Sequence, residues 1–229
     1  MSFRGQISLD GPSGTGKSSV ARDVARKLGA AYLDTGAMYR AATVAVLDAG
    51  VSLDDKIAVA RAVSGATIEV RTDARREVVR VDGVDVRERI RGAEVTRAVS
   101  PVSAVPAVRR LLVARQRELV AAADAVVVEG RDIGTVVLPD ATLKIYLTAS
   151  PEVRAQRRAG QLGVRDPAKV AALAQDLRRR DDYDSRRADS PLRPAEDAIV
   201  VDSTELDRAA VVRRILELAT DNVPAEETA

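Results

Sequence analysis

The residues with the clearest chemical potential form one glycine-rich segment, Gly11-Pro12-Ser13-Gly14-Thr15-Gly16-Lys17-Ser18. Glycines allow successive backbone N–H groups to turn toward a single anion, and a helix that begins directly afterwards adds its positive end. The ammonium group of Lys17 can reach the outer phosphates of a nucleoside triphosphate, and the hydroxyl of Ser18 can bind magnesium. We therefore predict that this segment, together with Ser19, binds phosphates; the alternative is a glycine-rich turn without a ligand.

A second polar group, Glu129-Gly130-Arg131-Asp132, follows the apolar run Ala125-Val126-Val127-Val128. Such a run is typical of a buried parallel strand, so these side chains should emerge at the edge of the sheet, near the phosphates. The segment Asp34-Thr35-Gly36-Ala37-Met38-Tyr39-Arg40 follows another short strand, and Arg40 could meet a second phosphate there. The alternatives are a loop held by ion pairs and an arginine on an exposed helix.

Two further groups of arginines lie in one charged segment of the second half of the chain. Arg154, Arg157 and Arg158 follow a helix start at Ser150-Pro151-Glu152, and residues 178–187 are dense in both charges. Ion pairs on a solvated helix are the ordinary explanation for such a run. The alternative is a mobile lid that brings arginines over a transferring phosphate, and two arginine groups in one glycine-interrupted segment favour it.

Short apolar strands that alternate with helices predict the scaffold for these groups, an open parallel α/β sheet. The expected strands are residues 7–10, 30–34, 125–128, 143–147 and 198–204, and helices are expected at 19–28, 53–63 and 106–119. Ligands of such sheets bind beyond the carboxyl ends of the strands. These ends carry the acidic residues Asp10, Asp34, Glu129 and Asp202. We therefore expect the loop motifs on one rim of the sheet.

Three segments depart from this alternation. Within residues 65–98, apolar and polar residues alternate at 67–71 and 78–86, and Asp82-Gly83 predicts a tight turn, so a small antiparallel insertion is expected. Residues 153–189 are expected to be helical, with interruptions at Gly160 and Gly163. The polar residues 220–229 predict a frayed tail.

The composition excludes several classes of protein. The 229 residues contain no cysteine and no histidine, which excludes disulfides, cysteine metal sites and histidine-based nucleophile systems. Phosphoryl transfer tolerates this absence, because positioning and charge neutralisation supply most of its catalysis. A net charge of +2 and an aromatic content of 2% disfavour a nucleic-acid partner, and no apolar run approaches the length of a membrane span. We expect a soluble protein of the reducing cytoplasm.

The later motifs make the sequence similar to the bacterial cytidylate kinases, which belong to the nucleoside monophosphate kinase family. The resemblance spans nearly the whole chain. Beside the glycine-rich segment, it is carried by Leu33-Asp34-Thr35-Gly36-Ala37-Met38-Tyr39-Arg40, Glu129-Gly130-Arg131-Asp132-Ile133-Gly134-Thr135-Val136-Val137, Arg180-Asp181-Asp182-Tyr183-Asp184-Ser185-Arg186-Arg187 and Ile199-Val200-Val201-Asp202-Ser203-Thr204.

This resemblance implies a P-loop fold with a five-stranded parallel sheet flanked by helices, a small antiparallel β insertion and a helical lid. It implies a single kinase domain of residues 1–229, with a monophosphate-binding part at 36–110, the insertion at about 65–98 and the lid at 151–190. The resemblance also implies that the protein is a monomer.

The resemblance also implies a reaction and the residues that serve it. ATP, with Mg²⁺, would phosphorylate CMP, and dCMP as a second substrate, to CDP or dCDP. The phosphate of the monophosphate would be held by Arg40, Arg131 and Arg187. Cytosine would be faced by Ser100, Arg109 and Asp132, and the sugar hydroxyls by Asp184. Thr35 would belong to the same substrate site. The catalytic set would be Lys17, Arg131, Arg154, Arg157 and Arg158.

The chemistry of the residues agrees with cytosine as the base. A carboxylate such as Asp132 accepts a hydrogen bond from the cytosine amino group, whereas uracil would place a carbonyl there and leave polar groups unpaired. Transfer to UMP, AMP or another small acceptor remains an alternative. A GTP-dependent switch is another, but it requires an Asn-Lys-x-Asp motif, and Asn222 is the only asparagine of the sequence.

Overall fold

The computed structural model describes residues 3–187 and 189–221, and its centre is a five-stranded parallel sheet. The strand order is β2-β6-β1-β7-β8, so the parallel α/β sheet expected from the sequence is confirmed. The strands are β1 (Gly5–Asp10), β2 (Ala31–Asp34), β6 (Ala125–Glu129), β7 (Leu143–Thr148) and β8 (Ile199–Asp202). Asp34 and Leu9 both pair in register with Glu129, which brings the acidic strand ends together on one rim.

Helices cover both faces of the sheet, which explains the continuous apolar run of residues 125–128 in the interior strand β6. On one face, Val127 and its neighbours pack against α1 (Lys17–Leu28) and α8 (Arg208–Asp221). On the other face, Val126 and Val128 pack against α2 (Thr35–Asp48) and α5 (Pro106–Ala121). The low aromatic content is thus no obstacle to a core, because Val, Ala, Leu and Ile fill both layers.

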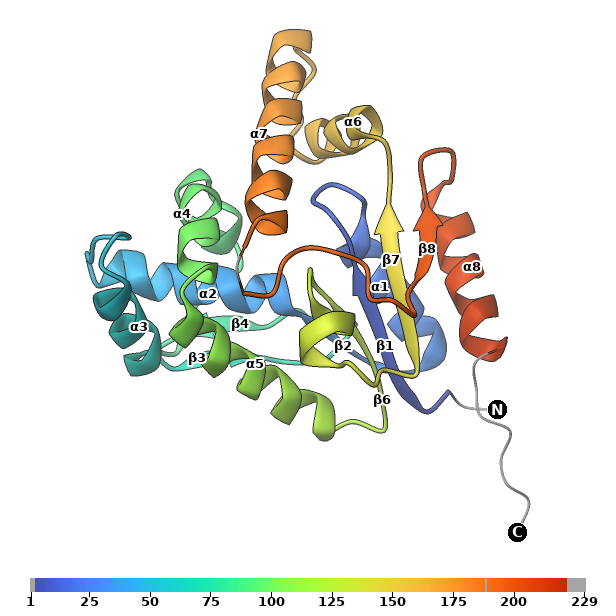
Figure 1. Cartoon of the computed structure of the whole chain (residues 1–229), viewed down its shortest axis with the longest axis horizontal. Helices are drawn as coiled ribbons and strands as arrows, with labels where there is room; N and C mark the ends of the chain where they lie inside the picture. The colour runs from blue at the N-terminus through green and yellow to red at the C-terminus, as the bar shows by residue number, and fades with distance from the viewer. Residues whose placement is uncertain (1–2, 188, 222–229) are drawn as a thin grey trace.

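A small antiparallel sheet, β3-β4-β5, lies against α2 on one side of the molecule (Figure 1). Its strands are β3 (Ile68–Val70), β4 (Val79–Val81) and β5 (Val84–Asp85). Asp82 and Gly83 connect β4 to β5 with φ angles of 49° and 80°, the two positive values that a tight hairpin turn requires. Antiparallel strands end at Asp85, so the patch expected at 65–98 differs in its last third. There the chain forms η1 (Arg89–Arg91) and α4 (Ala93–Ser103).

Two helix predictions differ from the structure in their boundaries. The helix expected at 53–63 is α3 (Lys56–Gly65), because the side chain of Asp55 caps the N–H groups of Ile57 and Ala58. The helical segment expected at 153–189 is divided into α6 (Pro151–Gln161) and α7 (Pro167–Ser185). Gly163 has a φ of 66° in the connection, and Asp166 caps α7, whereas Gly160 lies inside α6.

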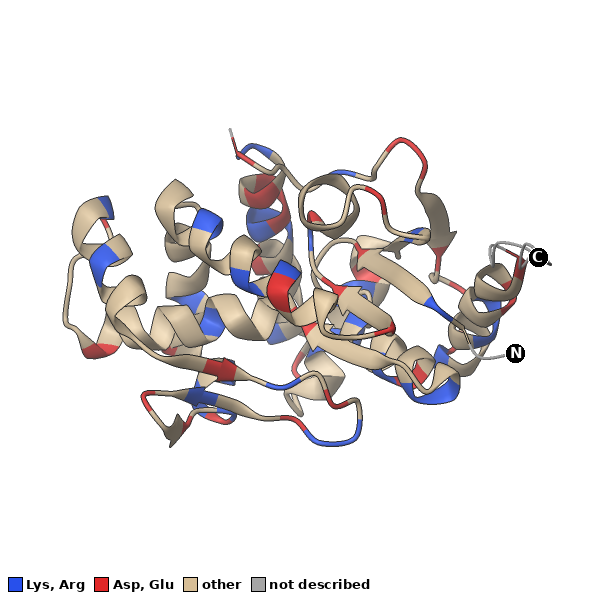
Figure 2. Ribbon diagram, turned by 90° about the horizontal axis from the view of Figure 1, so that it is seen from below, with Lys and Arg blue, Asp and Glu red and all other residues tan. Residues whose placement is uncertain are grey.

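Helices α6 and α7 stand over the carboxyl ends of the strands, above the rim where the acidic residues meet (Figure 1). Lys, Arg, Asp and Glu positions are interspersed over the elements (Figure 2). No helix within the described ranges is both long and apolar enough to cross a membrane. The tail predicted for 220–229 lies outside the described residues from position 222 onward.

Candidate active site

The glycine-rich segment forms the turn from β1 into α1, as its position after a buried strand predicts. Gly11 has a φ of 144°, and a Cβ atom there would lie 2.0 Å from the carbonyl oxygen of Leu147. Gly14 has a φ of 84°, and its Cβ atom would lie 2.9 Å from the carbonyl oxygen of Arg154. Both positions therefore need glycine for conformation and for space. We call residues 11–18 the phosphate loop.

Lys17 lies buried inside this loop. Its Nζ donates a hydrogen bond of 2.7 Å to the carbonyl oxygen of Pro12, and the hydroxyl of Thr15 is 3.5 Å away. Burial and the neighbouring Arg131 lower the pKa of Lys17 well below its usual value. A buried ammonium group whose partners are neutral oxygens can gain a charged partner when an anion enters the loop. Gly16 and Ser19 stand at the start of α1, with Ser19 exposed.

Ser18 and Glu129 place oxygen atoms together beside the loop. The Ser18 hydroxyl donates a 3.0 Å hydrogen bond to Glu129 Oε2, and the Tyr32 hydroxyl donates to Glu129 Oε1. Burial and the nearby Asp34 carboxylate raise the pKa of Glu129 to about 7. Hydroxyl and carboxylate oxygens suit Mg²⁺, which usually keeps waters and substrate phosphates as its other ligands. The described residues contain no larger acidic cluster that could hold a metal ion by itself.

Arg109 and Asp132, which the resemblance assigns to the cytosine site, form a buried ion pair. Nη2 of Arg109 donates to Oδ2 of Asp132. Arg109 exposes only 3% of its surface and Asp132 only 5%. The guanidinium group lies 5.4 Å from the ring centroid of Tyr39. Burial raises the pKa of Asp132, although Arg109 opposes this rise. Ser103 accepts a hydrogen bond from Arg109 through its carbonyl and donates its hydroxyl to the Ser100 carbonyl.

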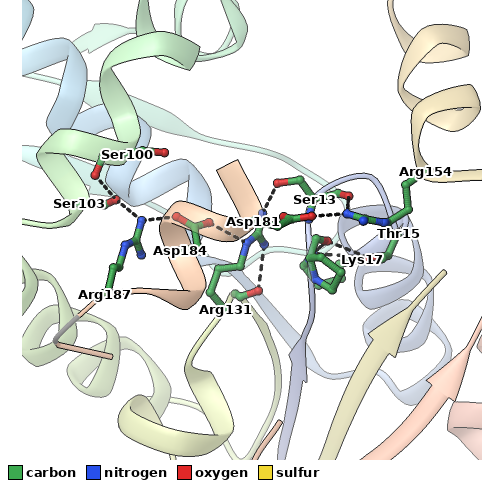
Figure 3. Close-up of polar contacts among 12 residues, drawn as sticks. Ser13, Thr15, Lys17, Ser100, Ser103, Arg131, Arg154, Asp181, Asp184 and Arg187 are labelled. Atoms are coloured by element: carbon green, nitrogen blue, oxygen red, sulfur yellow. Dashed lines mark hydrogen bonds and ion pairs between the residues drawn. The ribbon is translucent and has the colours of Figure 1, made fainter. Parts of the chain in front are cut away.

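Arg131 bridges the phosphate loop and α7 (Figure 3). Its Nη2 donates a 2.8 Å hydrogen bond to the hydroxyl of Ser13, and its Nε lies 3.5 Å from Oδ2 of Asp184. Arg187 donates to Asp184 Oδ1 and, over 2.9 Å, to the hydroxyl of Ser103. Arg131 is distant in sequence from Asp184 and Arg187, which lie three residues apart, and these contacts place three expected substrate residues side by side.

Arg40 and Arg180 extend this cluster of cations. Burial and neighbouring arginines lower the pKa of Arg40 to about 10 and that of Arg180 to about 9. Arg40 donates to the Ile90 carbonyl and the Thr96 hydroxyl, over 3.0 Å and 3.2 Å. Among the described residues, four buried Nε atoms of this region have no hydrogen-bond partner: those of Arg131, Arg154, Arg180 and Arg187. Arg131, Arg154 and Arg187 pair with Asp181 or Asp184, yet these Nε atoms keep hydrogen-bonding capacity, and such buried donors on neighbouring cations mark a site for an anion.

The three arginines of α6 have separate surroundings. Arg154 donates to the Ser13 carbonyl over 3.1 Å and pairs with Asp181. Arg157 is held by backbone carbonyls at Thr15, Ser203 and Leu206, with a further bond to the Ser203 hydroxyl. Arg158 is half-buried and donates to Gln161 on its own helix. Only Arg154 of this group contacts the loop with an acidic partner beside it.

Thr35, a residue of the predicted set, donates its hydroxyl to the Glu129 carbonyl over 2.7 Å.

Several other residues of this site lie outside the set predicted from the sequence. The position of Glu129 at a strand end could have indicated its role. Arg180 and Asp181 belong to a motif already recognised in the sequence. Ser103 and Tyr32 carried no such signal, because their contacts depend on how α4 and β2 pack.

Comparisons with known proteins agree with this geometry. The family model described as cytidylate kinase matches residues 7–221. The cytidylate kinase of Rhodococcus opacus (strain B4) is 58% identical over 216 residues, or 94% of each chain. That of Nocardia farcinica (strain IFM 10152) is 55% identical over 219 residues, covering 95% of this chain and 94% of its own.

A solved structure supports the fold alone. The gluconokinase from Sinorhizobium meliloti 1021 aligns with a TM-score of 0.50 at 18% identity, and the alignment covers 96% of this chain and 94% of that one. The family is shown by sequence, since the matched residues run from β1 to the end of α8 and include every motif of the rim. The chain belongs to the cytidylate kinase family.

Proposed function

We propose that the protein transfers the terminal phosphoryl group of ATP to CMP, and also to dCMP, forming ADP and CDP or dCDP. An oxygen of the CMP phosphate attacks the γ-phosphorus in line, the bond to the β–γ bridging oxygen breaks, and that oxygen leaves with ADP. The observation that carries the proposal is the group of buried arginines whose Nε atoms make no hydrogen bond. It lies between the phosphate loop and the Arg109–Asp132 pair.

On the donor side, the amides of the phosphate loop and Lys17 bind the phosphates of ATP. Ser18 and Glu129 offer the protein oxygens for Mg²⁺, which neutralises phosphate charge when bound. Lys17 exchanges its carbonyl partner at Pro12 for a phosphate oxygen, a stronger, charge-assisted contact.

On the acceptor side, the phosphate of CMP carries its own charge, and no strong base is needed to activate it. Arg40, Arg131 and Arg187, with Arg180 beside them, neutralise that charge so that two anions can approach each other. Asp184, held by Arg131 and Arg187, receives the sugar hydroxyls. Thr35 fixes the start of α2 below this site through the Glu129 carbonyl.

Cytosine is selected by the Arg109–Asp132 pair, with Ser100 on the same side. Asp132 accepts from the exocyclic amino group, and Arg109 donates to the adjacent ring nitrogen and carbonyl. Uracil presents a carbonyl where cytosine presents the amino group, so a buried carboxylate would face an acceptor.

Two parts of the single domain move in this scheme. Residues 36–110 form the monophosphate-binding part, and residues 151–190, which include α6 and α7, form the lid. Closure brings Arg154 to the transferring group, with Arg157 and Arg158 on the same helix, and excludes water that would otherwise accept the phosphoryl group. The enzyme acts as a cytoplasmic monomer.

A panel of nucleoside monophosphates in a coupled assay of ADP release tests the proposal. CMP and dCMP should turn over fastest, and faster turnover of UMP would overturn the choice of base. Asp132→Ala should lower the kcat/KM ratio of CMP over UMP while leaving ATP affinity within about twofold. The exposed Asp140→Ala is the charge-matched control. Unchanged selectivity in Asp132→Ala would refute the base contact.

A further inference from the structure

An acidic residue of α7 reaches into the phosphate loop, although the loop is a site for anions (Figure 3). Oδ1 of Asp181 accepts a 3.1 Å hydrogen bond from the backbone N–H of Ser13, and Oδ2 accepts from Nη1 of Arg154. The same Arg154 nitrogen donates to the Ser13 carbonyl over 3.1 Å. The side chain of Asp181 is 14% exposed. A loop amide, an arginine and a carboxylate thus close one ring of contacts.

The donors that Asp181 uses are the kind that a phosphate uses. Backbone N–H groups of a phosphate loop and a guanidinium group both bind phosphate oxygens, and both bind carboxylate oxygens in the same geometry. The carboxylate also lies close enough to Lys17 to favour its charged form. One negative group therefore satisfies the loop amide and the lid arginine at once.

We propose that Asp181 is a positioning residue that stands in for a donor phosphate oxygen on the phosphate loop. This inference deepens the proposed function, on which it rests. Asp181 holds Arg154 against the loop until the phosphates of ATP displace the carboxylate. The phosphate then takes over the Ser13 amide, whose single N–H cannot serve two anions, and repulsion between phosphate and carboxylate moves the Arg154 guanidinium to the phosphate. Binding of ATP thereby transfers Arg154 from Asp181 to the reacting phosphoryl group.

The exchange also links the two substrate sides. Asp181 and Asp184 lie three residues apart on α7, and such residues share one face of a helix. Asp181 contacts the donor loop, whereas Asp184 is held by Arg131 and Arg187 on the acceptor side. When ATP displaces Asp181, it therefore acts on α7, the helix that also carries Asp184 on the acceptor side.

The neighbouring Asp182 provides a matched control. It carries the same charge on the same helix, but its side chain is exposed and makes no side-chain hydrogen bond or ion pair with the described residues. A general effect of negative charge on ATP binding should appear in both Asp181→Asn and Asp182→Asn. An effect of the contact with Ser13 and Arg154 should appear only in Asp181→Asn.

Calorimetric titration of ATP without an acceptor nucleotide tests the proposal. Asp181→Asn should bind ATP about five- to tenfold more tightly than the wild type, because ATP no longer displaces a charged group. Asp182→Asn should stay within about twofold of the wild type. Equal or weaker ATP binding by Asp181→Asn would overturn the stand-in role. Because this titration involves no CMP, its outcome is independent of a failure of CMP turnover.

Two more readouts separate positioning from a general loss of structure. In steady state, Asp181→Asn should lower the KM for ATP by a larger factor than it changes kcat, because saturating ATP has already displaced Asp181 from Arg154. A damaged fold would raise KM instead. In the wild type, the NMR resonance of the Ser13 amide should shift on addition of ATP, and Asp181→Asn should shift it before ATP is added. A Ser13 resonance that is the same in both proteins would exclude the contact.

Discussion

At the scale of single residues, the site combines groups that the sequence identifies with partners that it does not. The type and spacing of Lys17 predict a phosphate contact, and the family resemblance implies the phosphate contact of Arg131 and the base contact of Asp132. Their partners follow from packing. Arg157, for example, stands in a row of expected catalytic arginines, yet it binds the carbonyls of Thr15 and Ser203. Motif positions predict which residues matter, whereas hydrogen-bond partners depend on how helices are placed.

Tyr32 illustrates such a partner. Its hydroxyl and that of Ser18 are the two donors that face the Glu129 carboxylate. If Ser18 turns to a magnesium ion, Tyr32 is left to orient Glu129. Tyr32→Phe should therefore raise the Mg²⁺ concentration for half-maximal activity several-fold and weaken binding of ATP measured with Mg²⁺ more than without it. Tyr39→Phe, another buried tyrosine, is the control. Equal Mg²⁺ concentrations for half-maximal activity in the two variants would refute this role of Tyr32.

Asp10 predicts a pH dependence of stability. Its carboxylate accepts from the N–H groups of Ile133 and Gly134, at 2.9 Å and 2.7 Å, and thus ties β1 to the segment after Asp132. Burial raises its pKa to about 6, although the hydrogen bonds from Gly134 and Ile133 oppose the rise. Between pH 4 and 6 the folded state therefore keeps a proton that the unfolded state loses, so Asp10 reduces the unfolding free energy as pH rises.

This reduction is on the order of 3 kcal/mol for a shift of about two pKa units. Urea unfolding of Asp10→Asn at pH 4.5, 5.5 and 7 should show a flatter decline in stability than the wild type. Asp140→Asn, at an exposed position, should leave the decline unchanged. An Asp10→Asn variant with the same pH profile as the wild type would show that Asp10 is ionised throughout this range.

At the scale of elements, apolar runs predict the sheet well, because parallel strands buried on both faces need no polar residues. The helical regions are less predictable. The connection between α6 and α7 depends on one backbone conformation at Gly163 and on the cap at Asp166, while Gly160 continues its helix. The segment η2 (Ile133–Val137) has no sequence signal of its own, since the carboxylate of Asp10 organises its first amides.

The two glycines of this region predict opposite effects on stability. Gly160→Ala should stabilise α6 by about 1 kcal/mol, because a Cβ atom there meets no neighbour and alanine favours a helix. Gly163→Ala should destabilise the protein by about 1 kcal/mol, because φ is 66° although space is open. Urea unfolding and amide exchange across residues 151–161 measure both effects. Changes of the same sign would show that the helix boundary differs from that of α6.

At the scale of the molecule, donor and acceptor groups come from different layers and meet only at the rim. The phosphate loop joins the sheet to α1, Arg40 and Arg109 belong to α2 and α5 on one face of that sheet, and Arg154 and Asp184 belong to the two helices above (Figure 1). The order of motifs along the chain predicts this division, but not the distance between the parts. That distance is what ligands should change if residues 151–190 act as a lid.

The absence of cysteine from the sequence makes this change measurable, since two introduced cysteines are then the only labelling sites. Ala172→Cys on α7 and Ser64→Cys on α3 are exposed positions, one in the proposed lid and one in the monophosphate-binding part. Energy transfer between dyes there should increase on addition of a non-hydrolysable ATP analogue with CMP, and less with either alone, because each ligand recruits different arginines. Lys27→Cys with Glu217→Cys, on α1 and α8 over one sheet face, should show no change. Equal transfer with and without both ligands in the first pair would refute closure.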